Sequence, residues 1–123
     1  MKILIVDDSK AMRMIVIRTL RQAGFGGHDI VESGYGAEGL AALTKDPFDL
    51  VLSDWNMPQM NGVDFLIAAR AGGSKVPFGF VTSEGTVAMR TQAADAGANF
   101  LIAKPFTAES FESALKGFFK AAA

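Results

Sequence analysis

Cysteine is missing from the 123 residues of this chain, and histidine, tryptophan and tyrosine each occur only once. Without cysteine the protein has no disulfide, no thiolate metal site and no cysteine nucleophile. The single histidine, His28, likewise excludes a histidine-rich metal centre. Any chemistry must therefore come from carboxylates, hydroxyls and amines.

The chain also lacks an excess of positive charge and any long apolar run. Its 12 Lys and Arg residues face 13 Asp and Glu residues, so we expect no nucleic-acid partner, because such partners require basic residues that neutralise phosphates. The apolar run at residues 3–6 is far shorter than a signal peptide or the ~20 residues of a membrane span. We therefore expect a cytoplasmic protein without membrane insertion.

Short apolar runs alternate with helical spacing five times along the chain. The runs are residues 3–6, 30–31, 50–52, 78–81 and 100–103. This alternation predicts an α/β fold of three layers, a parallel five-stranded sheet with helices on both faces. The length fits one domain at about 100–200 residues per domain, so we expect residues 1–123 to form a single domain.

The individual elements differ in how apolar they are. Helices are predicted over residues 9–23, 36–45, 62–71 and 84–96, and after Thr107. The helix at 84–96 has little apolar area beyond Val87 and Met89, which predicts a mobile helix. The apolar strands at 3–6 and 50–52 should be central, and the polar strand at 28–32 should lie at an edge. The last helix should bury an apolar stripe made of Phe111, Ala114, Leu115, Phe118 and Phe119.

Polar residues follow four of these runs: Asp7 and Asp8, then Asp54, then Thr82, then Lys104. The carboxyl ends of parallel strands share one edge of the sheet, where such folds bind ligands. Each residue also has an ordinary explanation, because Asp8 could cap a helix and the residues around Thr82 and Lys104 could form helix starts or loops. Four such coincidences at one edge are less probable than one functional site.

Three clustered carboxylates call for a cation. Two carboxylates about 4 Å apart repel by about 4 kcal/mol at an effective dielectric of about 20. Oxygen-only ligation favours Mg²⁺, and Mg²⁺ suggests phosphoryl chemistry. Asp54 is then the best nucleophile, Asp7 and Asp8 are metal ligands, and Thr82 and Lys104 are suited to contact a phosphoryl group.

Four sequence blocks, ILIVDDS, LVLSDWNMPQMNG, FVTSE and AKPFT, occur in this order over essentially the whole chain. In type, order and spacing they resemble the receiver domain of bacterial two-component response regulators, in particular its single-domain, CheY-like members. The resemblance implies a flavodoxin-like (βα)5 fold with strand order 2-1-3-4-5. It also implies that the protein is a phosphoprotein of a phosphorelay, for which a chemotaxis system is one candidate, and catalyses only its own phosphorylation and dephosphorylation.

The resemblance assigns the metal ligands as follows. Asp8, the phosphoacceptor Asp54 and the backbone carbonyl of Asn56 would bind Mg²⁺ directly, and Asp7 would act mainly through water.

Other roles follow from the same resemblance. Thr82 and Lys104 would contact the phosphoryl group, Asn56 and Glu84 would tune dephosphorylation, and the peptide bond between Lys104 and Pro105 would be cis. A sensor histidine kinase would donate the phosphoryl group. Since the chain ends at Ala123, we expect output through protein contact, on a face formed by the fourth helix, fifth strand and fifth helix.

Some positions depart from the family's usual pattern. Leu101 occupies the switch position, where the family usually has Tyr or Phe, and Phe100 should point to the opposite face of its strand. Gly79 interrupts the fourth strand, and residues 34–36 read Gly-Tyr-Gly. With Leu101 in place of an aromatic ring, the conformational response should run mainly through Thr82 and the backbone.

Two alternatives remain from the residues themselves. One is a receiver-like protein-binding scaffold that works independently of phosphorylation. The other is an enzyme, either a flavin protein of this fold or a phosphatase with an aspartate nucleophile. A flavin site would want a Ser/Thr/Gly-rich loop and a phosphatase an Asp-x-Asp motif, whereas residues 7–10 read Asp-Asp-Ser-Lys.

Overall fold

The computed structural model describes residues 2–25 and 29–116, in which strands and helices alternate along the chain. The elements are β1 (Lys2–Val6), α1 (Lys10–Gln22), β2 (Asp29–Ser33), α2 (Gly36–Lys45), β3 (Leu50–Ser53), α3 (Gly62–Ala71), β4 (Phe78–Thr82), α4 (Val87–Ala96), β5 (Phe100–Ala103) and α5 (Ala108–Leu115). His28, Phe118 and Phe119 lie outside the described residues.

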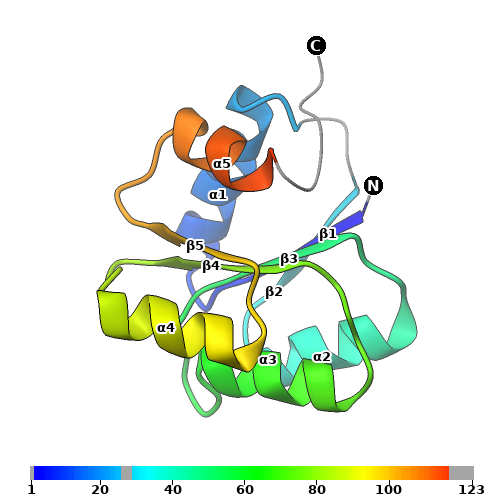
Figure 1. Ribbon diagram of the computed structural model, residues 1–123. Helices are drawn as coiled ribbons and strands as arrows, with labels where there is room; N and C mark the ends of the chain where they lie inside the picture. The colour runs from blue at the N-terminus through cyan, green and yellow to red at the C-terminus, as the bar shows by residue number, and fades with distance from the viewer. Residues whose placement is uncertain (1, 26–28, 117–123) are drawn as a thin grey trace.

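The five strands form one parallel sheet in the order β2-β1-β3-β4-β5. The predicted three-layer α/β fold is confirmed, because α1 and α5 cover one face of the sheet and α2, α3 and α4 cover the other (Figure 1). The apolar strands β1 and β3 are flanked on both sides, as predicted, and the polar β2 lies at an edge. This topology gathers the carboxyl ends of the strands at one edge.

Alternation along each strand fills two separate cores. Ile3 and Ile5 of β1 face α1 and α5, where they join Phe111 and Leu115. The residue between them, Leu4, faces the other side of the sheet and belongs to the core beneath α2, α3 and α4. Both cores extend to the carboxyl edge of the sheet, so the polar residues that follow the strands are attached to well-packed strand ends.

Side-chain caps fix where the helices begin. The Ser9 hydroxyl accepts the backbone N–H of Met12 at 3.2 Å and starts α1. The predicted start of the fourth helix at residue 84 is wrong, because the Thr86 hydroxyl caps the N–H of Met89 at 3.1 Å and the helix begins at Val87. Residues 83–86 therefore form an exposed loop between β4 and α4.

Gly79 and Phe100 are paired neighbours on β4 and β5. A Cβ at Gly79 would collide with the Phe100 ring, so the glycine leaves the space that the ring fills. Phe100 packs against the core beneath α1 and α5, whereas Leu101 packs on the opposite side of the sheet, as predicted from strand alternation. Gly79 and Phe100 are therefore complementary in size, and this contact explains the glycine in β4.

The glycines at the start of α2 serve close packing. The Met60 side chain fills the space next to Gly36, and the ring of Phe65 lies against Gly39. A larger residue at Gly36 would displace the flexible Met60 side chain, and one at Gly39 would require Phe65 and Val6 to shift by a few tenths of an ångström. These contacts explain Gly36, the last residue of the Gly-Tyr-Gly segment.

The helix α4 buries little apolar surface, but hydrogen bonds hold its C-terminal end. Among its described residues Ala93 is the buried one, and Val87 is 82% exposed. At the other end, Arg70 donates from Nη2 to the carbonyl oxygen of Gly97 at 2.7 Å and from Nη1 to that of Val76 at 2.6 Å. The sparse anchor agrees with the sequence, and the expected mobility of α4 stays a prediction.

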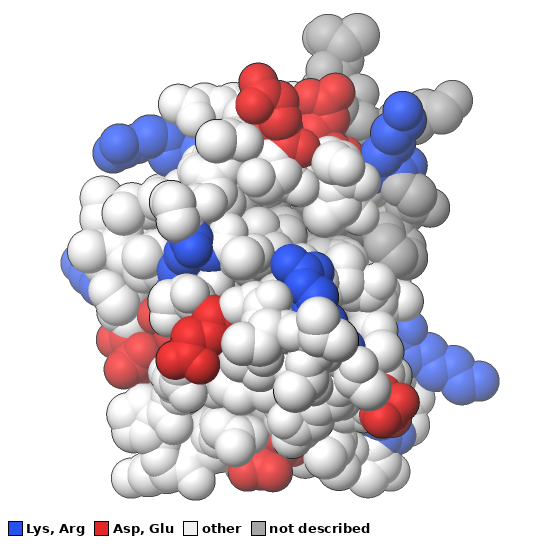
Figure 2. Space-filling view, turned by 60° about the vertical axis from the view of Figure 1, so that its left-hand side comes forward, with Lys and Arg blue, Asp and Glu red and all other residues white. Residues whose placement is uncertain are grey.

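The surface carries mixed charge. Figure 2 brings forward the side that includes the carboxyl edge of the sheet, and acidic and basic side chains are interspersed there with uncharged ones. In the described part of the chain, no helix has the length and apolarity that crossing a membrane requires.

Candidate phosphorylation site

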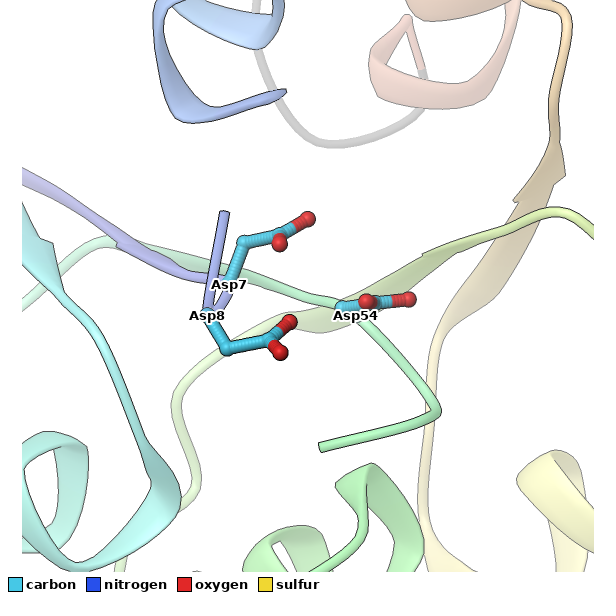
Figure 3. Close-up of side chains that lie close together, drawn as sticks. All are labelled: Asp7, Asp8 and Asp54. Atoms are coloured by element: carbon cyan, nitrogen blue, oxygen red, sulfur yellow. The ribbon is translucent and has the colours of Figure 1, made fainter. Parts of the chain in front are cut away.

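The ends of β1 and β3 bring three carboxylates together. Asp7 and Asp8 follow β1 and Asp54 follows β3, and each offers one carboxylate oxygen within 4.8 Å of the others. Figure 3 shows the Asp8 side chain extending toward Asp54. The strand ladder continues into the cluster, because the N–H of Asp54 donates to the Val6 carbonyl oxygen at 2.9 Å. The predicted acidic cluster is therefore present in this structure.

Lys104, at the end of β5, completes the charge arrangement. Its Nζ lies 3.7 Å from Asp54 Oδ1 and 3.9 Å from Asp7 Oδ2. Its backbone N–H donates to the Thr82 carbonyl oxygen at 2.7 Å, and the peptide bond to Pro105 is cis, as the resemblance implied. One ammonium group thus faces two carboxylates, which leaves the site with a negative surplus.

Burial and mutual repulsion disfavour ionisation of the two inner carboxylates. The pKa of Asp54 is raised mainly by burial and further by the nearby Asp8, although Lys104 and the backbone N–H groups of Trp55 and Asn56 lower it. The pKa of Asp7 is also raised, again mainly by burial, with a further contribution from Asp54. A bound cation would relieve both effects.

The donor set fits a hard cation. Three aspartates supply oxygen ligands alone, with Asp7 buried, Asp54 half-buried and Asp8 exposed to solvent. Oxygen ligation with room for water on the exposed side is the arrangement that Mg²⁺ prefers. The site can therefore hold a divalent ion and, beside it, an anionic group that pairs with Lys104.

The remaining predicted site residues lie around this cluster. Thr82, at the end of β4, is fully buried, and its hydroxyl oxygen accepts the N–H of Glu84 at 3.3 Å. The side chains of Asn56 and Glu84 are exposed. Leu101 is half-buried in β5. The described structure places Asp7, Asp54 and Lys104 in contact, and Thr82 joins them through the backbone of Lys104.

Two structural residues of the site were not found from the sequence. A Cβ at Gly62 would collide with the carbonyl oxygen of Asp54, so this glycine lets α3 begin against the site. Arg13 donates from Nη1 to the carbonyl oxygen of Asp7 at 2.6 Å. The glycine at the end of the block LVLSDWNMPQMNG was a visible signal, whereas nothing distinguished Arg13 from the other charged residues of α1.

Comparison with known proteins gives the same assignment as the geometry. The family described as "Response regulator receiver domain" matches residues 3–116. The chain is 40% identical to the probable chemotaxis protein CheY of Rhizobium etli, over 98% of this chain and 93% of that protein. It is 39% identical to the chemotaxis protein CheY of Pseudomonas aeruginosa, over 98% of this chain and 97% of that protein.

Solved structures agree. The chemotaxis protein CheY4 of Vibrio cholerae superimposes with a TM-score of 0.84 at 32% identity, covering 96% of this chain and 98% of that one. These relatives are receivers of the CheY type and not conventional enzymes, and membership implies a kinase partner and downstream targets. With its acidic pocket of Asp7, Asp8 and Asp54, the chain belongs to the response regulator receiver family and is a CheY-type chemotaxis response regulator.

Proposed function

We propose that Asp54 accepts a phosphoryl group from the phosphohistidine of a sensor histidine kinase, with Mg²⁺ bound at the acidic cluster. The observation that carries this proposal is that Asp54 lies beside two further carboxylates and one ammonium group. The Lys104 ammonium is 3.7 Å from Asp54 Oδ1 and 3.9 Å from Asp7 Oδ2. Receivers work in the compartment where the kinase obtains ATP, so the proposal places the protein in the cytoplasm.

The proposed reaction is a transfer between two protein side chains. An oxygen of the ionised Asp54 carboxylate attacks phosphorus, the bond between phosphorus and the donor imidazole nitrogen breaks, and that nitrogen takes up a proton from solvent. Mg²⁺ held by Asp8, Asp54 and the Asn56 carbonyl would supply positive charge that stabilises the transferring group. Asp7 would hold water molecules of the metal's shell.

Lys104 and Thr82 would receive the transferred phosphoryl group. Lys104 already pairs with Asp54, so its ammonium group can follow the negative charge from the carboxylate to the phosphoryl oxygens. The Thr82 hydroxyl would donate to one of these oxygens, which requires a movement of its side chain or of the loop it caps. Asn56 and Glu84, both exposed, would control how water reaches the aspartyl phosphate.

The partner face would consist of α4, β5 and α5. A shallow groove in this face is lined by residues of all three elements: Arg90, Phe100, Leu101, Ile102, Ala103, Ser110, Ser113 and Ala114. The Thr82 hydroxyl accepts the N–H of Glu84 at 3.3 Å, so a displaced Thr82 would change the loop that leads into α4. Phosphorylation would thereby bias a two-state surface that a target protein reads.

Phosphorylation with a small phosphodonor tests the proposal. Wild-type protein with Mg²⁺ and acetyl phosphate should gain the mass of one phosphoryl group in intact-mass spectrometry, and Asp54→Asn should gain none. The Asp29→Asn variant, which removes an exposed carboxylate from the other end of the sheet, is the matched control and should be labelled normally. Equal labelling of Asp54→Asn would show that another residue accepts the group, and no labelling of the wild type would favour a phosphorylation-independent scaffold.

A further inference from the structure

Arg13, in the first turn of α1, joins the acidic cluster to the edge strand β2. We propose that Arg13 is a positioning residue: its guanidinium holds the main chain of Asp7 so that the carboxylates are arranged for the cation before it binds. The inference rests on the proposed Mg²⁺ site and concerns what orients its ligands.

The contacts of Arg13 form a two-sided clamp. Nη1 donates to the carbonyl oxygen of Asp7 at 2.6 Å, and Nε donates to Glu32 Oε1 at 2.9 Å. The Arg13 side chain is only 15% exposed, so its contact with the Asp7 carbonyl is shielded from water, whereas the Glu32 side chain is 41% exposed and its contact with Arg13 is open to solvent. A guanidinium offers its donors in a rigid planar fork, which lets one side chain reach both acceptors in a fixed orientation.

The carbonyl that Arg13 holds determines the direction of two ligands. It belongs to the planar peptide unit between Asp7 and Asp8, so fixing it restricts ψ of Asp7 and φ of Asp8. The backbone N–H of Asp7 is also held by β2, because it donates to the carbonyl oxygen of Ser33 at 3.1 Å. Both sides of the Asp7 backbone are thus tied to β2, one directly and one through Arg13.

Positioning and simple charge predict opposite effects on cation binding. A positive charge beside an acidic cluster lowers its affinity for Mg²⁺, so a charge effect alone would make a neutral variant bind more tightly. Loss of positioning would make it bind more weakly, as happens when the groups that orient metal ligands are removed. The direction of the change therefore separates the two roles.

Trp55 provides a measurement that does not depend on phosphorylation. It is the single tryptophan, it is 8% exposed, and its backbone N–H donates to Asp54 Oδ1 at 2.8 Å. Mg²⁺ titrations followed by its fluorescence, and repeated by calorimetry, give the dissociation constant of each variant. We expect Arg13→Gln to raise the Mg²⁺ Kd by about 3- to 10-fold, which lies below or at the lower limit of the roughly 10- to 100-fold typical of residues that orient metal ligands, because Arg13 holds the backbone of Asp7 and not a ligand atom.

Two further variants test the clamp. Arg13→Lys keeps the charge but cannot bridge both acceptors, so its Mg²⁺ Kd should rise more than twofold. Glu32→Gln keeps Arg13 but weakens its anchor and should raise the Kd by a smaller factor. Arg70→Gln is the control, because Arg70 binds a carbonyl oxygen at the same 2.6 Å at the other end of the sheet. It should lower the melting temperature and leave the Kd unchanged.

Several results would overturn the inference. A Kd for Arg13→Gln that is lower than that of the wild type, or within twofold of it, would show that Arg13 does not position the ligands. Wild-type affinity in Arg13→Lys would show that charge alone suffices. If Arg13→Gln does not fold, an unchanged Kd in Glu32→Gln rejects the clamp. Absence of any Mg²⁺ response in the wild type would instead reject the proposed metal site, and the inference with it.

Discussion

Replacing Asp54 with Asn should stabilise the metal-free protein, although it removes the proposed phosphoacceptor. Asn is nearly isosteric and keeps an oxygen that can accept the N–H of Trp55, which Asp54 Oδ1 accepts at 2.8 Å. The substitution therefore removes charge with little change in packing. What it removes is the repulsion between Asp54 and the two other carboxylates, together with the attraction to Lys104.

The distances in the structure give the size of this repulsion and this attraction. Carboxylate oxygens up to 4.8 Å apart repel by about 3–4 kcal/mol per pair at an effective dielectric of about 20. The Lys104 ammonium, 3.7 Å from Asp54, attracts it by about 4–5 kcal/mol on the same scale. Two repulsions outweigh one attraction, and burial adds to the cost of the charge. Because Asp8 is exposed and water screens its share, we expect a net stabilisation of about 1–2 kcal/mol.

The pH dependence follows from the raised pKa of Asp54. Below the ordinary value of 3.8 the carboxyl group is protonated in both the folded and the unfolded chain, so its charge costs the folded state nothing. As pH rises through the raised folded pKa, the folded protein must give up a proton that it holds more tightly than the unfolded chain does. The wild type therefore loses stability over this interval, and the advantage of Asp54→Asn should grow with pH and then level off.

Urea unfolding in chelator from pH 4 to pH 8 measures this advantage, and thermal melts should show it as an increase of about 3–8 °C. The Asp29→Asn variant controls for net charge and should change stability by less than about 0.5 kcal/mol. Saturating Mg²⁺ should reverse the order, because at 100 times its Kd it stabilises the wild type by about 2.7 kcal/mol. If Asp54→Asn were no more stable than the wild type in chelator at neutral pH, the reasoning about a strained carboxylate cluster would be wrong.

Three further predictions follow from the same structure. Because Asn56 and Glu84 are polar and exposed, the phosphoryl group should be lost within minutes after donor removal, and a mass signal that persists for many hours would contradict this. Gly79→Ala should lower stability by about 1–3 kcal/mol through collision with the Phe100 ring, and a double-mutant cycle with Phe100→Ala should recover part of that loss. Beryllofluoride, a stable phosphoryl mimic, should change hydrogen exchange from the β4–α4 loop through β5 more than in α1, and changes confined to the loop after β3 would point to another output face.

Strand order and site composition could be predicted from the sequence because both follow from local patterns. Apolar runs followed by polar residues are visible in a single sequence, and the parallel connection rule places their ends at one edge. The prediction that Lys104 lies at the same edge as the aspartates needed only these two facts, and in the structure its ammonium group is 3.7 Å from Asp54. The start of α4 was predicted wrongly because Thr82, Ser83 and Thr86 are all residue types that cap helices well. Which of them is the N-cap depends on where β4 ends, and in the structure it is Thr86.

Close packing and long-range hydrogen bonds could not be predicted in the same way. Gly79 was an unexplained irregularity until the ring of Phe100 was placed across it from the neighbouring strand. The apolar spacing of residues 9–23 predicts one stripe made of Met12, Ile15, Val16 and Leu20. For Ile15 this is wrong, because it is 43% exposed, whereas Val16, Thr19 and Leu20 are buried. A helical period leaves such boundary positions undecided.

The helices on this side of the sheet differ in how firmly their ends are held. The helices α2 and α3 pack closely where Gly39 meets the Phe65 ring, and the C-terminal end of α4 is tied to the body by Arg70. The N-terminal end of α4 is held by longer hydrogen bonds: Arg90 donates to the carbonyl oxygens of Leu101 at 3.2 Å and of Gly85 at 3.3 Å, while Val87 is 82% exposed and residues 83–86 form an exposed loop. A displacement that begins at Thr82 therefore meets the least resistance toward the start of α4. The C-terminal end would serve as the fixed point, so the helix should tilt rather than translate.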